Sequence, residues 1–294
     1  MLGQSTRFLV AFLQPLGHRS KIHRIDGQHA AGEVTYWLCR RCKGAPLGRP
    51  RYANPSLTGL LVVDKPLGWS SMDIVRRLRR VTGGAKAGHA GTLDPLATGV
   101  VVCCLGKATK LIDSLMGLTK IYEAAVDLSA FTNTDDREGP REEVHVATPP
   151  TSEVILAALP QFIGEIDQKP PAYSAIHVDG QRAYKLARRG ETVDLPSRKV
   201  HVHAIELLHY TWPIATLRIT CGKGTYIRSL ARDLGTALGT GGHLAALRRT
   251  AIGPYKLENA FDQARLEEPI GEKDLLPLPL PTRRNEINDE MKSS

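Results

Sequence analysis

The stretch Gly88-His89-Ala90-Gly91-Thr92-Leu93-Asp94-Pro95-Leu96-Ala97-Thr98-Gly99 decides how the chain is organised. It places one carboxylate, Asp94, in a loop of glycines and small residues, and Pro95 biases Asp94 toward an extended backbone. The apolar run 100–105 follows at once and predicts a buried strand. The stretch therefore predicts a carboxylate on a rigid loop that leads into the core.

An isolated Asp–Pro pair is most often a structural turn, so its surroundings have to decide what Asp94 does. Four further motifs lie between residues 56 and 255. They are Gly59-Leu60-Leu61-Val62-Val63-Asp64-Lys65-Pro66-Leu67-Gly68-Trp69-Ser70-Ser71, Lys169-Pro170-Pro171-Ala172-Tyr173-Ser174-Ala175 with Gly180 and 184–190, Gly222-Lys223-Gly224-Thr225-Tyr226-Ile227-Arg228, and Leu247-Arg248-Arg249-Thr250. In order and spacing these motifs, with the 88–99 loop, resemble the TruB family of tRNA pseudouridine synthases.

The pattern of secondary structure is compatible with that family. Strands are expected over 57–64, 121–128, 198–210 and 214–221, and helices over 71–81, 152–159, 181–189 and 225–238. Strands and helices are mixed without regular βαβ alternation, which predicts an α+β fold with a mixed, largely antiparallel central sheet flanked by helices. The resemblance implies the pseudouridine synthase fold.

The resemblance also implies an activity. It is the isomerisation of uridine to pseudouridine at position 55 in the T-arm of tRNA, by base flipping and an Asp-dependent rearrangement of the glycosidic bond. The reaction oxidises nothing and transfers no group from a donor, so no cofactor and no metal are expected.

Site roles follow from the resemblance residue by residue. Asp94 would be the catalytic carboxylate, either as nucleophile or as base and electrostatic stabiliser. Arg228 would pair with Asp94 and keep it ionised, and Tyr122 would stack on the uracil ring. Tyr226 and Leu247 would complete the apolar walls around the base.

Other residues would contact the RNA around this centre. His89 resembles the family histidine that fills the space left by the flipped base, and Lys65 would shape the pocket floor. Arg76 and Arg80, on the polar side of the helix expected over 71–81, are plausible phosphate contacts. Further candidates of the same kind are Arg77, Arg79, Arg188 and Arg189.

Charge divides the chain of 294 residues into three parts. Residues 1–55 carry a net +7 and are expected to be a poorly ordered basic extension. Residues 56–256 are the expected catalytic domain, with a net +6. Residues 257–294 carry a net −4 and predict a short Pro- and acid-rich extended tail, too short for a complete PUA-type RNA-binding domain.

Cysteine usage and hydropathy limit the cellular compartments in which the protein is expected. The five cysteines form no disulfide framework, which favours a reducing cytoplasm. Cys39-Arg40-Arg41-Cys42 is a lone CxxC without a second pair at zinc-site spacing. No apolar run is as long as a membrane span. The basic, acid-poor N-terminus leaves an organelle transit peptide open. A monomer with tRNA as its partner is expected.

Two other functions compete with this one. A relative guided by a small RNA within a ribonucleoprotein would be expected to need a PUA-type domain and protein partners, and the short tail argues against it. A non-catalytic tRNA-folding factor on the same scaffold would not need Asp94, Tyr122 and Arg228 together.

Overall fold

The computed structural model describes residues 56–174, 177–178, 181–182, 189 and 195–278. All of them belong to one compact unit, Tyr52–Ser294. The predicted N-terminal extension, including Cys39 and Cys42, and the candidate phosphate contact Arg188 lie outside the described residues.

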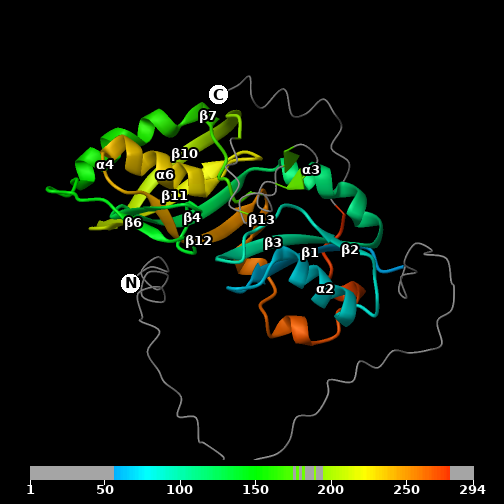
Figure 1. Cartoon of the computed structure of the whole chain (residues 1–294). Coiled ribbons are helices and arrows are strands. Elements are labelled where there is room, and N and C mark those ends of the chain that lie inside the picture. The colour runs from blue at the N-terminus through cyan, green and yellow to red at the C-terminus, as the bar shows by residue number, and fades with distance from the viewer. Residues whose placement is uncertain (1–55, 175–176, 179–180, 183–188, 190–194, 279–294) are drawn as a thin grey trace, which may run out of the picture. The chain divides into compact units, whose positions relative to one another are not determined.

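The described part of the chain is organised around one sheet. Its strands are β1 (Gly59–Lys65), β2 (Ala87–His89), β3 (Ala97–Leu105), β4 (Lys120–Asp127), β7 (Gly164–Gln168), β10 (Arg198–Thr211), β11 (Ile214–Cys221), β12 (His243–Ile252) and β13 (Tyr255–Lys256). They lie in the order β1–β3–β12–β4–β11–β10–β7, with β2 beside β3 and β13 beside β12 (Figure 1). The β12–β3 pair is parallel and the other pairs of this sheet are antiparallel, so the predicted α+β fold is confirmed.

Two small hairpins lie outside the central sheet. β5 (Ala130–Thr132) pairs with β6 (Arg141–Glu143), and β8 (His177–Val178) pairs with β9 (Gln181–Arg182). The basic helix predicted over 181–189 is therefore wrong at its start. A charge pattern cannot distinguish a short hairpin strand from the first turn of a helix, and residues 183–188 lie outside the described part.

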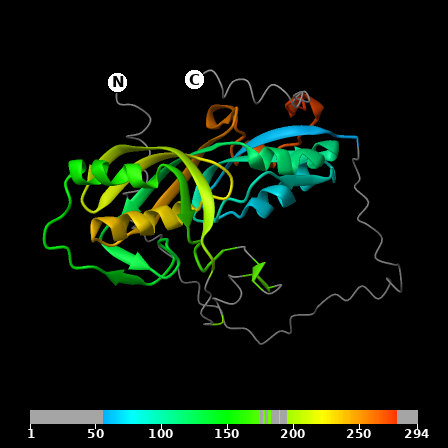
Figure 2. The same ribbon diagram turned by 90° about the horizontal axis from the view of Figure 1, so that it is seen from above.

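Helices cover the sheet at both of its ends. They are α2 (Ser71–Val81), α3 (Ile112–Gly117), α4 (Ser152–Ala158) and α6 (Ile227–Leu238), with 3₁₀ turns η1 (Gly106–Leu111), η2 (Leu159–Phe162), η3 (Leu257–Asn259), η4 (Arg265–Glu267) and η5 (Glu272–Asp274). Figure 2 shows α4 and α6 at one end of the sheet and α2 and α3 at the other.

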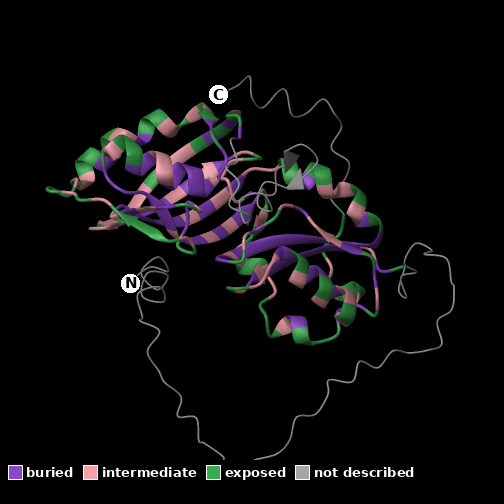
Figure 3. Cartoon of the chain, in the orientation of Figure 1, coloured by how far each residue is buried: buried purple, intermediate pink, exposed green. Residues whose placement is uncertain are grey.

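The pleat of the strands creates two apolar layers. Along β1, Leu61 and Val63 belong to the main core, which also receives the buried faces of α2, α4 and α6. Leu60 and Val62 point to the opposite face, into a smaller core beneath η1 and α3. The strands are therefore largely buried, while the outer faces of α2 and α4 are exposed (Figure 3).

Helix α2 illustrates how local sequence sets the element. Ser70 is the N-cap and forms a capping box with Asp73, which satisfies backbone N–H groups that the first turn leaves unpaired. Val75 and Leu78 are buried. Met72 is 44% exposed. Ser71, Ile74, Val75 and Leu78 form one buried stripe at i, i+3, i+4 and i+7, and Met72 lies about 100° away from it around the helix.

The segment after β13 packs against the sheet edge rather than extending into solvent. Leu60 and Leu276 exchange backbone hydrogen bonds of 3.0 and 2.8 Å, and Phe261 exchanges two with Val62 and Asp64. Leu266 is fully buried. The high Pro and acid content predicted an extended tail. Composition gives no sign of the backbone hydrogen bonds that join this segment to β1.

Among the residues that the structure describes, no helix is long and apolar enough to cross a membrane.

Candidate active site

Asp94 lies on the loop between β2 and β3, and this loop is fixed from several sides. The Ser71 hydroxyl accepts a hydrogen bond from the Leu93 N–H at 2.9 Å and lies 3.2 Å from the Leu93 carbonyl. The Ala97 N–H donates to the Asp94 carbonyl at 3.0 Å, which closes a turn around Pro95. The Asp94 side chain is 42% exposed, so its carboxylate stays accessible from solvent.

Arg228, in the first turn of α6, brings its guanidinium to this carboxylate. Its Nη2 lies 3.0 Å from Asp94 Oδ2, and its Nη1 lies 3.2 Å from Asp136 Oδ2. The Arg228 side chain is only 8% exposed. The structure therefore brings together the two residues that were predicted to pair, although they are far apart in the sequence.

Asp136 is a partner that the sequence analysis did not assign to the site. Its side chain is 4% exposed and accepts hydrogen bonds from the Thr134 hydroxyl at 2.7 Å and the Glu138 N–H at 3.0 Å. Arg228 also donates to the carbonyls of Thr134, at 3.1 Å, and Tyr173, at 3.0 Å. The guanidinium is thus held between two carboxylates and two carbonyls.

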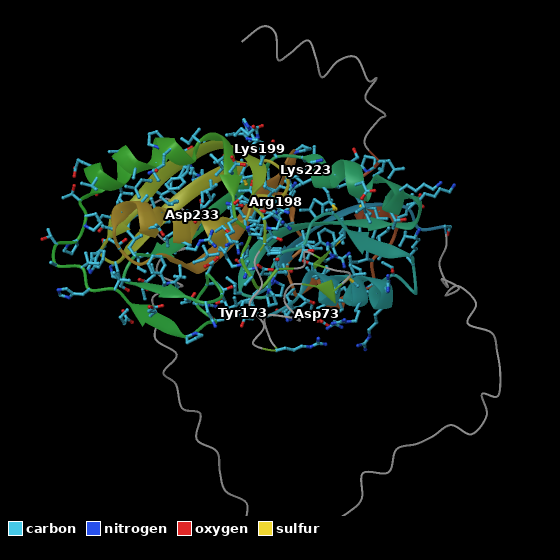
Figure 4. The ribbon with its side chains drawn as sticks, turned by 45° about the horizontal axis from the view of Figure 1, so that its top comes forward. Asp73, Tyr173, Arg198, Lys199, Lys223 and Asp233 are labelled. Atoms are coloured by element: carbon cyan, nitrogen blue, oxygen red, sulfur yellow. The ribbon has the colours of Figure 1, made fainter. Side chains whose placement is uncertain are left out.

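The ion pair opens into a cavity of about 570 Å³. Tyr122 from β4 and Leu247 from β12 line it and are 8% and 7% exposed, so both contribute apolar surface to its wall. Burial raises the pKa of the Tyr122 phenol, which keeps it neutral. Besides Arg228, the cations that line the cavity are Lys120, Arg198, Lys199, Lys223 and Arg249. Figure 4 shows three of them, Arg198, Lys199 and Lys223, close together.

Tyr226 precedes α6 and also lines the cavity. The fully buried amide of Gln168 holds its backbone, because Oε1 accepts from the Tyr226 N–H at 2.8 Å and Nε2 donates to the Tyr226 carbonyl at 3.0 Å. The Arg198 guanidinium lies 4.8 Å from the centre of the Tyr226 ring. Nothing in the sequence motif indicates the Gln168 contact, because it joins β7 to α6.

Two protein-family models match the sequence that forms this site. The model for the TruB family pseudouridylate synthase (N terminal domain) matches residues 79–227, and the model for the tRNA pseudouridylate synthase B C-terminal domain matches residues 228–275. The chain belongs to the TruB family.

Curated relatives of the TruB family agree. A protein named tRNA pseudouridine synthase B from Arthrobacter sp. (strain FB24) is 49% identical over 224 residues, which cover 74% of this chain and 72% of the relative. The protein of the same name from Thermobifida fusca (strain YX) is 47% identical, over 75% of this chain and 77% of the relative. The one from Xanthomonas oryzae pv. oryzae (strain MAFF 311018) is 50% identical, over 71% and 68%.

Solved structures support the same fold at lower identity. A chain in the crystal structure of the archaeal box H/ACA sRNP Nop10–Cbf5 complex matches with a TM-score of 0.54 and 30% identity, covering 72% of this chain and 53% of that one. A chain in a Cbf5–Nop10–Gar1 complex gives 0.57 and 29%, covering 76% and 60%. This TruB family member therefore spans only about half to three-fifths of these solved chains.

Lys65 lies beneath the loop that carries Asp94 and is fully buried. Its ammonium donates to the carbonyls of Trp69 at 2.6 Å, Pro66 at 3.1 Å and Pro95 at 3.4 Å. Burial lowers the pKa of Lys65 to about 8, and the negative charge of Asp94 opposes that shift. Lys65 thus joins the loop after β1 to the loop that carries Asp94.

His89 lies on β2, beside the cavity rather than among the residues that line it. Within the described part of the chain, its buried Nδ1 has no hydrogen-bond partner. Burial lowers the pKa of His89, and the nearby positive charge of Arg249 lowers it further.

Arg76 and Arg80 line a second, separate cavity of about 420 Å³ on α2, together with Gly68, Trp69, Asp73 and Arg77. Arg76 pairs with Asp73, and Arg77 pairs with Glu267. Arg79 donates to the Ala87 carbonyl at 3.0 Å, so it contributes to the fold on the other side of the helix.

Proposed function

We propose that this TruB family member acts on the uridine at position 55 in the T-arm of tRNA. The chain isomerises uridine to pseudouridine in tRNA, as the names of its curated relatives indicate. The observation that carries the proposed chemistry is the 3.0 Å ion pair between Arg228 and Asp94 at a cavity walled by Tyr122 and Leu247. The target position is what the resemblance to the TruB family implies.

The reaction breaks the bond between the ribose C1′ and uracil N1 and forms a bond between C1′ and C5. The proton on C5 leaves and a proton returns to N1, so the product is an isomer and no other reactant is needed. Two roles fit the half-exposed Asp94 carboxylate: it attacks as a nucleophile, or it takes the C5 proton and stabilises positive charge on the sugar. In both, the ion pair with the Arg228 guanidinium orients the carboxylate.

The detached base has to be retained while it turns. In this proposal the Tyr122 ring stacks on the uracil, and Leu247 and Tyr226 close the other sides. Such walls exclude water, which would otherwise hydrolyse the intermediate. His89, half-buried beside the cavity, would fill the space that the flipped base vacates in the RNA.

The charge of the cavity favours a polyanionic substrate. Among the described residues that line it there are six cations and one carboxylate, Asp94. Phosphate groups of RNA would be attracted to this surface, with a strong dependence of affinity on salt. We assign Arg76 and Arg80, in the second cavity, to further phosphate contacts, and Arg80 is the better candidate because Arg76 already pairs with Asp73.

The remaining features of the proposal concern the whole chain. We propose a catalytic domain over 56–256, a monomer, and a cytoplasmic location. Since all of the cations named above lie between residues 76 and 249, we expect a T-arm stem-loop to be nearly as good a substrate as whole tRNA. Removal of residues 1–55 is expected to leave a folded, active enzyme.

The test incubates the purified full chain, without guide RNA, with unmodified tRNA and with a T-arm stem-loop, and maps pseudouridine in each. Position 55 is expected to be modified in both RNAs. Asp94→Asn is expected to abolish modification while retaining RNA binding, because the amide is nearly isosteric with the carboxylate. Modification at another position would refute the proposed target, and a near-normal rate in Asp94→Asn would remove Asp94 from the mechanism. A requirement for a guide RNA would favour the ribonucleoprotein alternative.

A further inference from the structure

Arg249, on β12, is a buried cation to which the proposed reaction gives no role beyond its share of the positive charge of the cavity. Its side chain is 1% exposed, and no carboxylate lies within ion-pair distance in the described part of the chain. Three backbone carbonyls accept hydrogen bonds from it instead: Val100 at 2.6 Å, Gly91 at 3.2 Å and Thr92 at 3.4 Å. A guanidinium is seldom buried without a carboxylate, so its location needs an explanation.

The three acceptors lie on both sides of Asp94 along the chain. Gly91 and Thr92 precede the carboxylate, and Val100 lies in β3 after it. One guanidinium therefore joins the start of the catalytic loop to the strand into which the loop leads. Because the guanidinium is planar and rigid, it fixes the relative positions of the groups to which it donates.

The backbone of the same residue holds the end of the loop. Arg249 pairs with Gly99 in the parallel ladder between β12 and β3. Gly99 has a φ of +104°, and a Cβ atom there would lie 2.2 Å from the Arg249 carbonyl oxygen. This close approach is possible only for glycine, so β12 contacts the loop through both the backbone and the side chain of Arg249.

The side chain also contacts the residue assigned to base stacking. The guanidinium carbon lies 6.0 Å from the centre of the Tyr122 ring, at the limit of a cation–π contact. Arg249 and Tyr122 both line the cavity that contains Asp94. The same cation thus touches the loop that carries the carboxylate and the ring opposite it.

We propose that Arg249 is a positioning residue, which holds the 91–94 backbone and the Tyr122 ring in the relative positions that the reaction requires. The inference rests on the proposed function. It predicts that loss of the guanidinium slows the chemical step far more than it weakens RNA binding, because no group of Arg249 needs to touch the RNA backbone.

The test compares Arg249→Met, Arg249→Lys and the neighbouring control Arg248→Met. Arg248 is 23% exposed at its side chain, pairs with Asp64 at 2.8 Å and donates to the Thr98 hydroxyl at 3.1 Å, whereas Arg249 donates to the Gly91 and Thr92 carbonyls. For each variant and the unchanged protein, we would measure the thermal midpoint, the Kd for unmodified tRNA, and the single-turnover rate at saturating tRNA.

Arg249→Met is expected to lower the single-turnover rate by about 100-fold, which is the size of effect that a misplacement of about 1 Å produces. Its Kd should stay close to that of the unchanged protein. Arg249→Lys should recover part of the rate, since it keeps the charge but lacks the planar set of donors. Arg248→Met should leave the rate unchanged.

Three results would overturn the proposal: an unchanged rate in a folded Arg249→Met, an equal loss in Arg248→Met, or a loss confined to Kd. Failure of both Arg249 variants to fold would also overturn it, in favour of a purely structural role. Absence of pseudouridine formation by the unchanged protein would instead refute the proposed function, so the two failures are distinguishable.

Discussion

Replacing Asp136 by Asn removes one of the two carboxylates that hold Arg228, while keeping the size of the side chain. The Asp136 side chain is 4% exposed and its Oδ2 lies 3.2 Å from Arg228 Nη1. Asp94, the other carboxylate, is 42% exposed and lies 3.0 Å from Nη2. The substitution therefore removes the buried partner and leaves the solvated one.

The magnitude follows from burial. Removing one partner of a buried ion pair typically costs about 3–5 kcal/mol, because the other charge stays buried. The Asn oxygen can still accept a hydrogen bond from Nη1, which retains about 1 kcal/mol. We therefore expect the free energy of unfolding to fall by about 3 kcal/mol, and the thermal midpoint of a chain this size to fall by roughly 6–12 °C.

Catalysis should suffer separately, because Arg228 orients Asp94. We expect the single-turnover rate of Asp136→Asn at saturating tRNA, measured below its lowered midpoint, to fall by at least about tenfold. The matched control is Asp233→Asn. Asp233 lies on α6, the helix that carries Arg228, is 33% exposed and pairs with Arg232. An exposed pair contributes about 1 kcal/mol or less. If the two variants lose equal stability and Asp136→Asn keeps its full rate, the two-carboxylate account of Arg228 is wrong.

Three further predictions test other parts of the site. As the pH rises through about 8, Lys65 should lose its proton and one of its three carbonyl contacts, so the single-turnover rate should fall. The contribution of Lys65 to the free energy of unfolding should rise between about pH 8 and pH 10.5, because in this range the Lys65 side chain keeps its proton in the unfolded chain and loses it in the folded one. Lys65→Met should lack both effects. If the rate of Lys65→Met still falls above about pH 8, the fall does not come from Lys65. Tyr122→Ala should weaken RNA binding by about 1–3 kcal/mol and Tyr122→Phe by much less, since the ring supplies the stacking surface; equal losses in a filter-binding assay would implicate the hydroxyl. Gly99→Ala should lower the free energy of unfolding, measured in urea, by more than about 4 kcal/mol, because the added Cβ would collide with the Arg249 backbone. The control Gly83→Ala, at a φ of +65° with open space around it, should cost only about 1–2 kcal/mol. Similar losses in the two variants would mean that β12 moves to accommodate the Cβ at residue 99.

The fold could be predicted from the sequence where local pattern sets the structure. The strands around Trp212-Pro213 and the helix over Ile227–Leu238 appear as expected, because alternation and helical spacing are strong over their whole length. The prediction failed where a segment is short or paired over a distance. Gln181–Arg182 forms a two-residue strand, and the segment that contains Phe261 and Leu276 obtains its structure from hydrogen bonds to β1.

The residues of the candidate site also fall into those that the sequence predicted and those that it did not. The motif around Asp94 and the motif that ends at Arg228 were enough to predict their pairing, because the resemblance supplied the long-range contact. Asp136 and Gln168 both lie outside the motifs that carry the resemblance. Both act on α6 from elements more than fifty residues away in the sequence, and one sequence contains no record of such contacts.

Three buried cations from three different elements converge on the loop that carries Asp94. Lys65 from β1 donates to the Pro95 carbonyl, Arg228 from α6 pairs with Asp94, and Arg249 from β12 donates to the Gly91 and Thr92 carbonyls. Apolar packing alone could hold a loop, but it would leave the site without positive charge. Burying cations costs free energy that carbonyl partners recover only in part, so this arrangement favours an anion in the cavity. In the proposed reaction, bound RNA and the detached base would supply that charge, and these contacts hold the loop before RNA binds.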